Sequence, residues 1–200
     1  MSTKKLVTTA AGISLAVMSL SPVVAMAADG AALYQSKTCF ACHGVDAKTT
    51  IMPAYPKLAG QNKDYVLQQM KDIKSGTRKN GQSAAMMSVM SMVDDTEMDA
   101  IAEWLASLSR DAASSDAAAE GAKLYESKTC TACHGKDAQT PLLPNYPKLT
   151  GQNHEYALAQ MQDIKSGARA NGQSAGMKGV MGLVNDDEMK AIAEWLASSK

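Results

Sequence analysis

The 200-residue chain has few cysteines, histidines and aromatic residues, and it has no excess of charge of either sign. It contains four cysteines, three histidines and one phenylalanine, and aromatic residues make up only 4% of it. Its 20 basic residues balance 20 acidic ones, which gives no reason to expect nucleic acid or an anionic membrane as a partner. No segment shows sustained period-two alternation of apolar residues, so we expect an all-α fold.

One long apolar run is present, and it lies at the N-terminus. Two lysines precede a mostly apolar stretch over residues 6–20, and small residues follow at 25–27. This pattern predicts a signal peptide over residues 1–27, cleaved after Ala27, and export to the periplasm. A membrane anchor is the alternative, but the run is short for a span of about 20 apolar residues. Cleavage would leave 18 basic and 20 acidic residues, a formal charge of −2, and no transmembrane segment.

The rest of the chain consists of two similar copies of one sequence. A shift of 91 residues aligns residues 30–107 with 121–198 without a gap, and roughly two thirds of the aligned positions are identical. We therefore predict a first domain over 28–109, an exposed connector over 110–118 that is rich in Ala, Ser and Asp, and a second domain over 119–200. Each domain should enclose its own core, although about 80 residues make a purely apolar core marginal.

Within each copy we expect three principal helices. The first runs toward the first cysteine, and its glycine (Gly30 or Gly121) should let it cross closely over the last helix. The second ends at Gly76, and the last begins at Asp94 with a capping-box pattern. The proline-containing stretch before the second helix should be an extended loop, and we treat the methionine-rich segment before Asp94 as a loop as well.

All four cysteines and two of the histidines fall in two near-identical phrases, "TCFACHG" at 38–44 and "TCTACHG" at 129–135. Two thiols three residues apart can form thioethers to one haem, and the histidine that follows can bind its iron. A disulfide would not need the histidine, a thioredoxin-like site would need a βαβ unit, and a zinc site would need further repeated ligands. The motifs therefore predict two covalently bound haem c groups, held by the residues Cys39, Cys42, Cys130 and Cys133, with His43 and His134 as iron ligands.

The second iron ligand should also be repeated, and methionine is the suitable type. Two pairs satisfy this condition, Met86 with Met177 and Met90 with Met181. The residues alone leave the choice open, since methionine also fills gaps in cores. The run "MMSVMSM" could alternatively bind copper(I) through thioethers, but the copper ion would then compete with the haem iron for the same sulfur atoms.

Taken together, the motifs resemble a class I c-type cytochrome and, more specifically, the dihaem cytochrome c4 family. The likeness rests on CxACHG, YPKLxGQ, KSGxRxNG and the methionine segment before the last helix, each present in both copies. It implies Met86 and Met177 as the second iron ligands. It also implies hydrogen bonds from the haem-binding histidines to the carbonyls of Pro56 and Pro147. Arg78 and Arg169 are candidates for contact with haem propionates, with a solvated surface position as the alternative.

Iron held by His and Met has no open position for a substrate, so we expect an electron carrier and not an enzyme. Its partners would be redox proteins that bind transiently: a quinol-oxidising complex or dehydrogenase as donor, and a terminal oxidase or reductase as acceptor. The alternatives are a dedicated electron-transfer subunit of a periplasmic dehydrogenase and, less favoured, a dihaem peroxidase.

Overall fold

Ten helices and no strands make up the part of the chain that the computed structural model describes, residues 29–110 and 119–199. The first copy contains five of them: α1 (Gly30–Ser36), α2 (Phe40–His43), α3 (Lys63–Lys74), α4 (Ser83–Met90) and α5 (Asp95–Ser107). The second copy repeats the set: α6 (Ala119–Ser127), α7 (Thr131–His134), α8 (His154–Ser166), α9 (Ser174–Met181) and α10 (Asp186–Ser198). The all-α prediction is therefore confirmed. None of these helices is both long enough and apolar enough to cross a bilayer.

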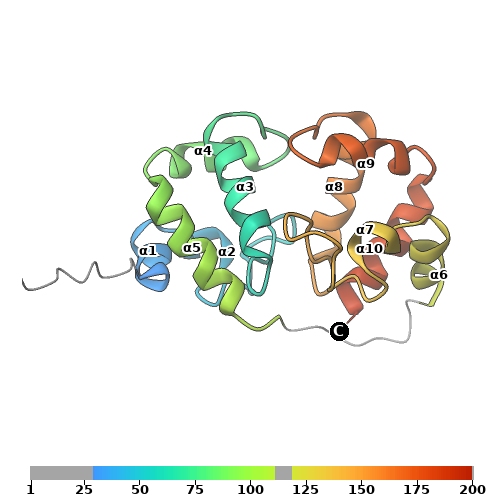
Figure 1. Ribbon diagram of the computed structural model, residues 1–200, viewed down its shortest axis with the longest axis horizontal. Coiled ribbons are helices and arrows are strands. Elements are labelled where there is room, and N and C mark those ends of the chain that lie inside the picture. Colours follow the sequence, from blue (N-terminus) through green and yellow to red (C-terminus); the bar gives the residue numbers. More distant parts are fainter. Residues whose placement is uncertain (1–28, 111–118, 200) are drawn as a thin grey trace, which may run out of the picture.

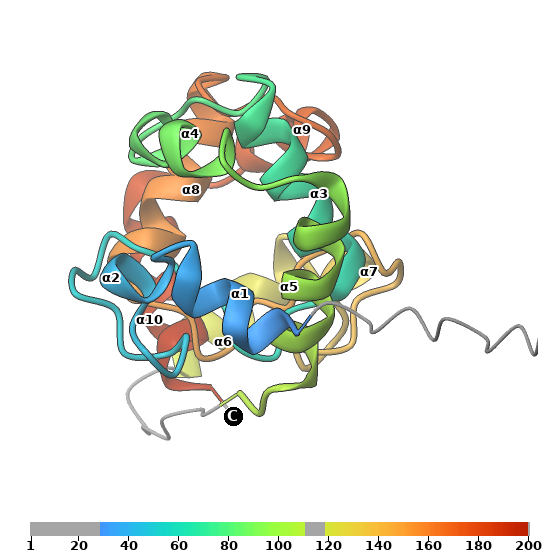
Figure 2. The same cartoon turned by 90° about the vertical axis from the view of Figure 1, so that its left-hand side faces the viewer.

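The two copies lie side by side, with α3 and α8 toward the middle of the molecule and α1 and α6 toward its ends (Figure 1). The view along the molecule in Figure 2 shows the same helices again in the second copy, behind the first. The expected signal peptide and residues 111–118 of the expected connector lie outside the described residues.

The last helix of each copy begins at a capping box, as predicted for the first copy. The side chain of Asp94 accepts from the backbone N–H of Glu97, and the Glu97 side chain accepts from the backbone N–H of Asp94. Asn185 and Glu188 form the same pair at the start of α10. These bonds satisfy N–H groups that a helix start otherwise leaves without partners, so they fix where α5 and α10 begin.

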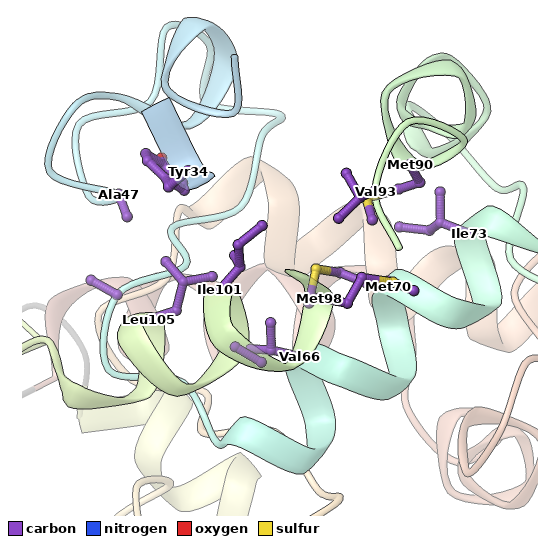
Figure 3. Packing of buried hydrophobic residues seen from close by; sticks show 12 residues of the cluster. Tyr34, Ala47, Val66, Met70, Ile73, Met90, Val93, Met98, Ile101 and Leu105 are labelled. Carbon is purple, nitrogen blue, oxygen red and sulfur yellow. The ribbon is translucent and has the colours of Figure 1, made fainter. Parts of the chain in front are cut away.

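Each copy has its own apolar core. In the first copy, one face of α3 packs on the apolar stripe of α5, and Tyr34 from α1 and Met90 from α4 complete the cluster (Figure 3). The second copy buries the equivalent residues around α8 and α10. The apolar stripe of α5 lies inside this core, since Met98, Ile101 and Leu105 are all buried.

The close crossing of α1 over α5 depends on a glycine, as predicted. A Cβ atom on Gly30 would clash with the backbone oxygen of Ala100 and lie 2.6 Å from the Cβ of Trp104. Gly121 has the same surroundings against α10. The crossing places the ring of Tyr34 4.8 Å from that of Trp104 and lets the Tyr34 hydroxyl donate to the carbonyl of Gly44, directly after the CxxCH motif.

Two sequence expectations were wrong in part. The methionine-rich segment is not a loop: residues 83–90 form α4 and the equivalent residues 174–181 form α9. Alanine and methionine favour the helix in α4, and burial of Met181 in the core holds α9 despite its two glycines. The connector is also not exposed where it begins. Arg110 is half-buried, and it donates to carbonyls of both copies, those of Ala59, Lys148 and Thr150.

Candidate functional site

The CxxCH motif of each copy forms a single helical turn. Cys39 is the N-cap of α2, and its carbonyl accepts from the backbone N–H of His43. The preceding residue, Thr38, has a φ of 61°, a strained conformation for a β-branched residue, and Thr129 repeats it with a φ of 64°. The turn leaves Cys39 half-buried and Cys42 exposed, so the two thiols stand at different depths along one wall.

All four thiols are free, so the disulfide alternative does not describe this structure. Burial raises the pKa of the Cys39 thiol and raises that of Cys130 to about 11. Within residues 29–110 and 119–199, no group of three or more His, Cys, Asp or Glu side chains is arranged to hold a metal ion. The zinc alternative therefore finds no support in the described residues.

The two motif histidines are buried, and each has one ring nitrogen fixed. Nδ1 of His43 lies 3.0 Å from the carbonyl oxygen of Pro56, and Nδ1 of His134 lies 3.1 Å from that of Pro147. Because a carbonyl can only accept, Nδ1 carries the proton and Nε2 keeps its lone pair for a metal. Burial lowers the pKa of both rings, which favours this neutral form.

A cavity of about 770 Å³ runs through both copies and connects the two motifs. It is lined by the four cysteines, both motif histidines, Pro56, Pro147, Arg78, Arg169 and all four candidate methionines. Met90 and Met181 are almost fully buried in the two cores, whereas Met86 and Met177 are partly buried and pack against the core edges. A haem fits this donor set: free thiols, a histidine with Nε2 available and a thioether line one cavity. The assignment of Met86 and Met177 stays a prediction.

Arg78 and Arg169 are not solvated surface residues. Both are buried, and each reaches into the other copy. Arg78 donates through Nη2 to the hydroxyl of Tyr156 and to Oε1 of Gln160, both at 3.1 Å. Arg169 donates in the same way to Tyr65 and Gln69. Contact with haem propionates stays a prediction. The guanidinium groups line the cavity, and within the described part of the chain they donate to amide and hydroxyl oxygens and to no carboxylate.

Sequence reasoning missed the residues that join the two copies. Gln61 and Gln152 each hold the loop of the opposite copy, and Asn80 and Asn171 donate to Asp163 and Asp72 across the same boundary. All four lie in the repeated motifs YPKLxGQ and KSGxRxNG. The repetition of these polar motifs is the one sequence feature that could have indicated a contact between the copies. The partners of these side chains lie in the opposite copy, so the sequence of one copy does not reveal them.

Known proteins match the chain along most of its length. The sequence model of the family Cytochrome c matches it twice, over residues 27–109 and 118–200. Cytochrome c4 of Azotobacter vinelandii is 32% identical over 191 residues, which cover 86% of this chain and 90% of that protein. A protein named thiosulfate dehydrogenase electron acceptor, from Stutzerimonas stutzeri (strain A1501), is 31% identical over 207 residues, 94% of this chain and 93% of that protein.

A solved structure of a similar protein has the same fold. The crystal structure of reduced recombinant cytochrome c4 from Pseudomonas stutzeri superposes with a TM-score of 0.74 at 29% identity, covering 87% of this chain and all of that one. The chain therefore belongs to the cytochrome c4 family, and it is a dihaem electron-transfer cytochrome whose two domains each carry a covalently attached haem c.

Proposed function

We propose that the chain is a periplasmic carrier that takes single electrons from a quinol-oxidising complex or a dehydrogenase and passes them to a terminal oxidase or reductase. One observation carries this proposal: the complete donor set occurs twice in one cavity, with the same histidine–carbonyl bond in both copies. Two sites built alike favour electron transfer over catalysis, because a dihaem peroxidase needs one site that differs from the other by an open position.

In this proposal the four cysteines would attach the two haems, and His43, His134, Met86 and Met177 would supply the protein ligands of the two irons. Haem iron held in this way supplies one-electron chemistry with little rearrangement. The chain's own residues keep the donors in place: Pro56 and Pro147 fix the two histidine rings, and α4 and α9 present the methionine side chains to the cavity.

Redox partners would dock where the CxxCH turn reaches the surface. Cys42 and Cys133 are exposed, and large apolar side chains lie exposed in the segments that follow, among them Ile51 and Leu142. A small apolar area of this kind suits a transient partner, for which tight binding would slow turnover. Export to the periplasm rests on the predicted signal peptide.

A second candidate is a dedicated acceptor for a dehydrogenase of sulfur compounds. It is favoured by the relative named thiosulfate dehydrogenase electron acceptor, which aligns over nearly the whole chain. The two roles differ in the electron donor, and the donor can be tested directly.

The test is stopped-flow reduction of the oxidised holoprotein by each donor. We expect fast reduction by membranes that contain a quinol-oxidising complex and a quinol. Reduction by thiosulfate dehydrogenase with thiosulfate, together with no reaction with the membranes, would support the second role and contradict the first. Periplasmic fractionation and a mature N-terminus at Ala28 would test the location; retention in the cytoplasm with residues 1–27 intact would overturn it.

A further inference from the structure

The loops that fix the two histidines also form the contact between the two copies. Oε1 of Gln61 accepts from the backbone N–H of Lys148 at 2.8 Å, and Nε2 of Gln61 donates to the carbonyl of Lys148 at 2.9 Å. Gln152 makes the same two bonds to Lys57, at 2.8 and 3.1 Å. Both glutamines are buried, with 5% and 8% of their surface exposed. The glutamine of each copy is therefore hydrogen-bonded to the loop of the other copy.

The peptide groups that these glutamines hold are the ones that fix the histidines. The carbonyl of Pro147 and the N–H of Lys148 belong to one peptide unit. Its carbonyl accepts from Nδ1 of His134, and its N–H donates to Gln61 of the other copy. The Pro56–Lys57 peptide joins His43 to Gln152 in the same way. A chain of two hydrogen bonds and one peptide group thus links each histidine to a glutamine in the opposite copy.

Such a chain changes how strongly the histidine donates to a metal. Because a peptide group is conjugated, an acceptor on its N–H shifts electron density toward its carbonyl oxygen. A stronger carbonyl acceptor draws the Nδ1 proton away from the ring, and Nε2 becomes a better electron donor. More electron density on the iron favours its oxidised form. The contact between the copies therefore acts on the same property that sets a haem potential.

We infer that Gln61 and Gln152 are positioning residues that tune the haem potentials across the boundary: Gln61 acts on the haem of the second copy, and Gln152 on the haem of the first. The inference rests on the proposed iron ligation by His43 and His134. It also explains why the motif YPKLxGQ occurs in both copies. Each motif contains a Pro–Lys peptide that the glutamine of the other copy binds, and a glutamine that binds the Pro–Lys peptide of the other copy.

The experiment compares Gln61→Met and Gln152→Met in the full-length holoprotein. Methionine keeps the length of the side chain and removes its hydrogen bonds. Redox titration followed by optical and NMR spectra gives the midpoint potential of each haem. The haems are assigned through NMR contacts to residues that differ between the copies, such as Phe40 and Thr131.

Loss of the Gln61 bonds should make the haem of the second copy easier to reduce and leave that of the first nearly unchanged. One hydrogen bond acting through a peptide should shift the equilibrium for electron exchange between the haems about two- to tenfold toward the second copy. A tenfold shift corresponds to about 59 mV for a one-electron couple. Gln152→Met should shift the same equilibrium by a similar factor in the opposite direction.

Asn62→Leu is the matched control. Nδ2 of Asn62 donates to the carbonyl of Tyr146 at 2.7 Å, so this variant loses a bond to the same loop but leaves the Pro147–Lys148 peptide held by Gln61. Its side chain makes no cap bond at the start of α3, so the helix should be kept. We expect both potentials to stay near those of the unchanged protein. A shift equal to that of Gln61→Met would mean that any loosening of the boundary moves the potentials, and would overturn the inference.

The inference would also be overturned if each glutamine variant moved both potentials equally, moved only the haem of its own copy, or moved neither. Should the variants fail to fold, the unchanged holoprotein still gives a test. A scalar coupling from the Lys148 amide nitrogen to the side-chain carbonyl carbon of Gln61 is expected, and its absence would contradict the proposed chain. Failure of the proposed function looks different: the unchanged protein would then lack two low-spin haems with histidine and methionine ligands.

Discussion

The two copies are nearly identical around the cavity and differ on the surface around it. The histidine–proline bond, the tyrosine–glycine bond and the tyrosine–tryptophan ring contact have the same geometry in both. Outside the cavity, Val45 is replaced by Lys136 and Lys63 by His154. The donor geometry is therefore the same in both copies, whereas the residues on the surface around it differ.

One asymmetry reaches the boundary itself. Arg110 follows the first copy and donates to the carbonyls of Lys148 and Thr150 in the second. Its Nε also donates to the carbonyl of Ala59, the first-copy residue aligned with Thr150, but among the described residues no guanidinium donates to Lys57, which aligns with Lys148. Burial lowers the pKa of Arg110 to about 10, so the guanidinium remains cationic at neutral pH. The half-buried positive charge thus makes two bonds to the second copy and one to the first.

The largest expected effect comes from removing a cysteine. Cys39→Ala should lower the covalently bound haem per chain, because one thioether to the first haem is lost, while the second copy keeps its haem. Intact mass and haem staining of the denatured protein would measure this. Cys130→Ala is the mirror-image control. Unchanged haem stoichiometry in both variants would contradict covalent attachment at these residues.

The methionine ligands give the next largest effect. Met177→Ala should remove the spectrum of histidine–methionine ligation from one of the two haems and raise its affinity for cyanide, because a coordination position opens. Met181→Ala should instead keep both spectra and lower the free energy of unfolding, since Met181 is buried in the core. The reverse outcome would assign Met181 as the ligand in the second copy.

Packing at the helix crossing should have a smaller effect that is equal in the two copies. Gly30→Ala and Gly121→Ala should each lower the free energy of unfolding by about 1 to 3 kcal/mol, because the new methyl group meets backbone atoms of the last helix. Gly179→Ala is the control. Its added Cβ has open space, so it should stabilise α9 by about 0.5 to 1 kcal/mol. Denaturant unfolding of the holoprotein would show whether each variant lowers or raises the free energy of unfolding.

The smallest expected effect tests the asymmetry. Arg110→Met should lower the free energy of unfolding by about 1 to 2 kcal/mol, because three buried carbonyls lose a charged donor. It should also lower the potential of the second haem more than that of the first, since the guanidinium bonds Lys148, next to the Pro147 carbonyl that fixes His134, and makes no such bond to Lys57. Equal changes in both potentials would show that the asymmetry has no electronic consequence.

The sequence predicted what is local or repeated, and it failed where a residue's partner lies in the other copy. The haem-binding CxxCH motifs and the capping box at Asp94 follow from spacing within a few residues. The roles of Gln61 and Arg78 depend on contacts across the boundary, which the repeat does not reveal. The helix α4 escaped prediction for another reason: methionine suits a ligand-bearing loop as well as a helix, and the equivalent segment of the second copy contains two glycines, which lower helix propensity.

We expect two haem sites of the same kind in one cavity, each with histidine and methionine ligands. The most direct test is the optical spectrum of the oxidised holoprotein, recorded through a redox titration and after addition of cyanide. We predict two haems per chain, both low-spin in the ferric state, both with the charge-transfer band of methionine-ligated iron, and neither rapidly bound by cyanide. High-spin ferric iron in either domain, or rapid cyanide binding at one haem, would contradict the account.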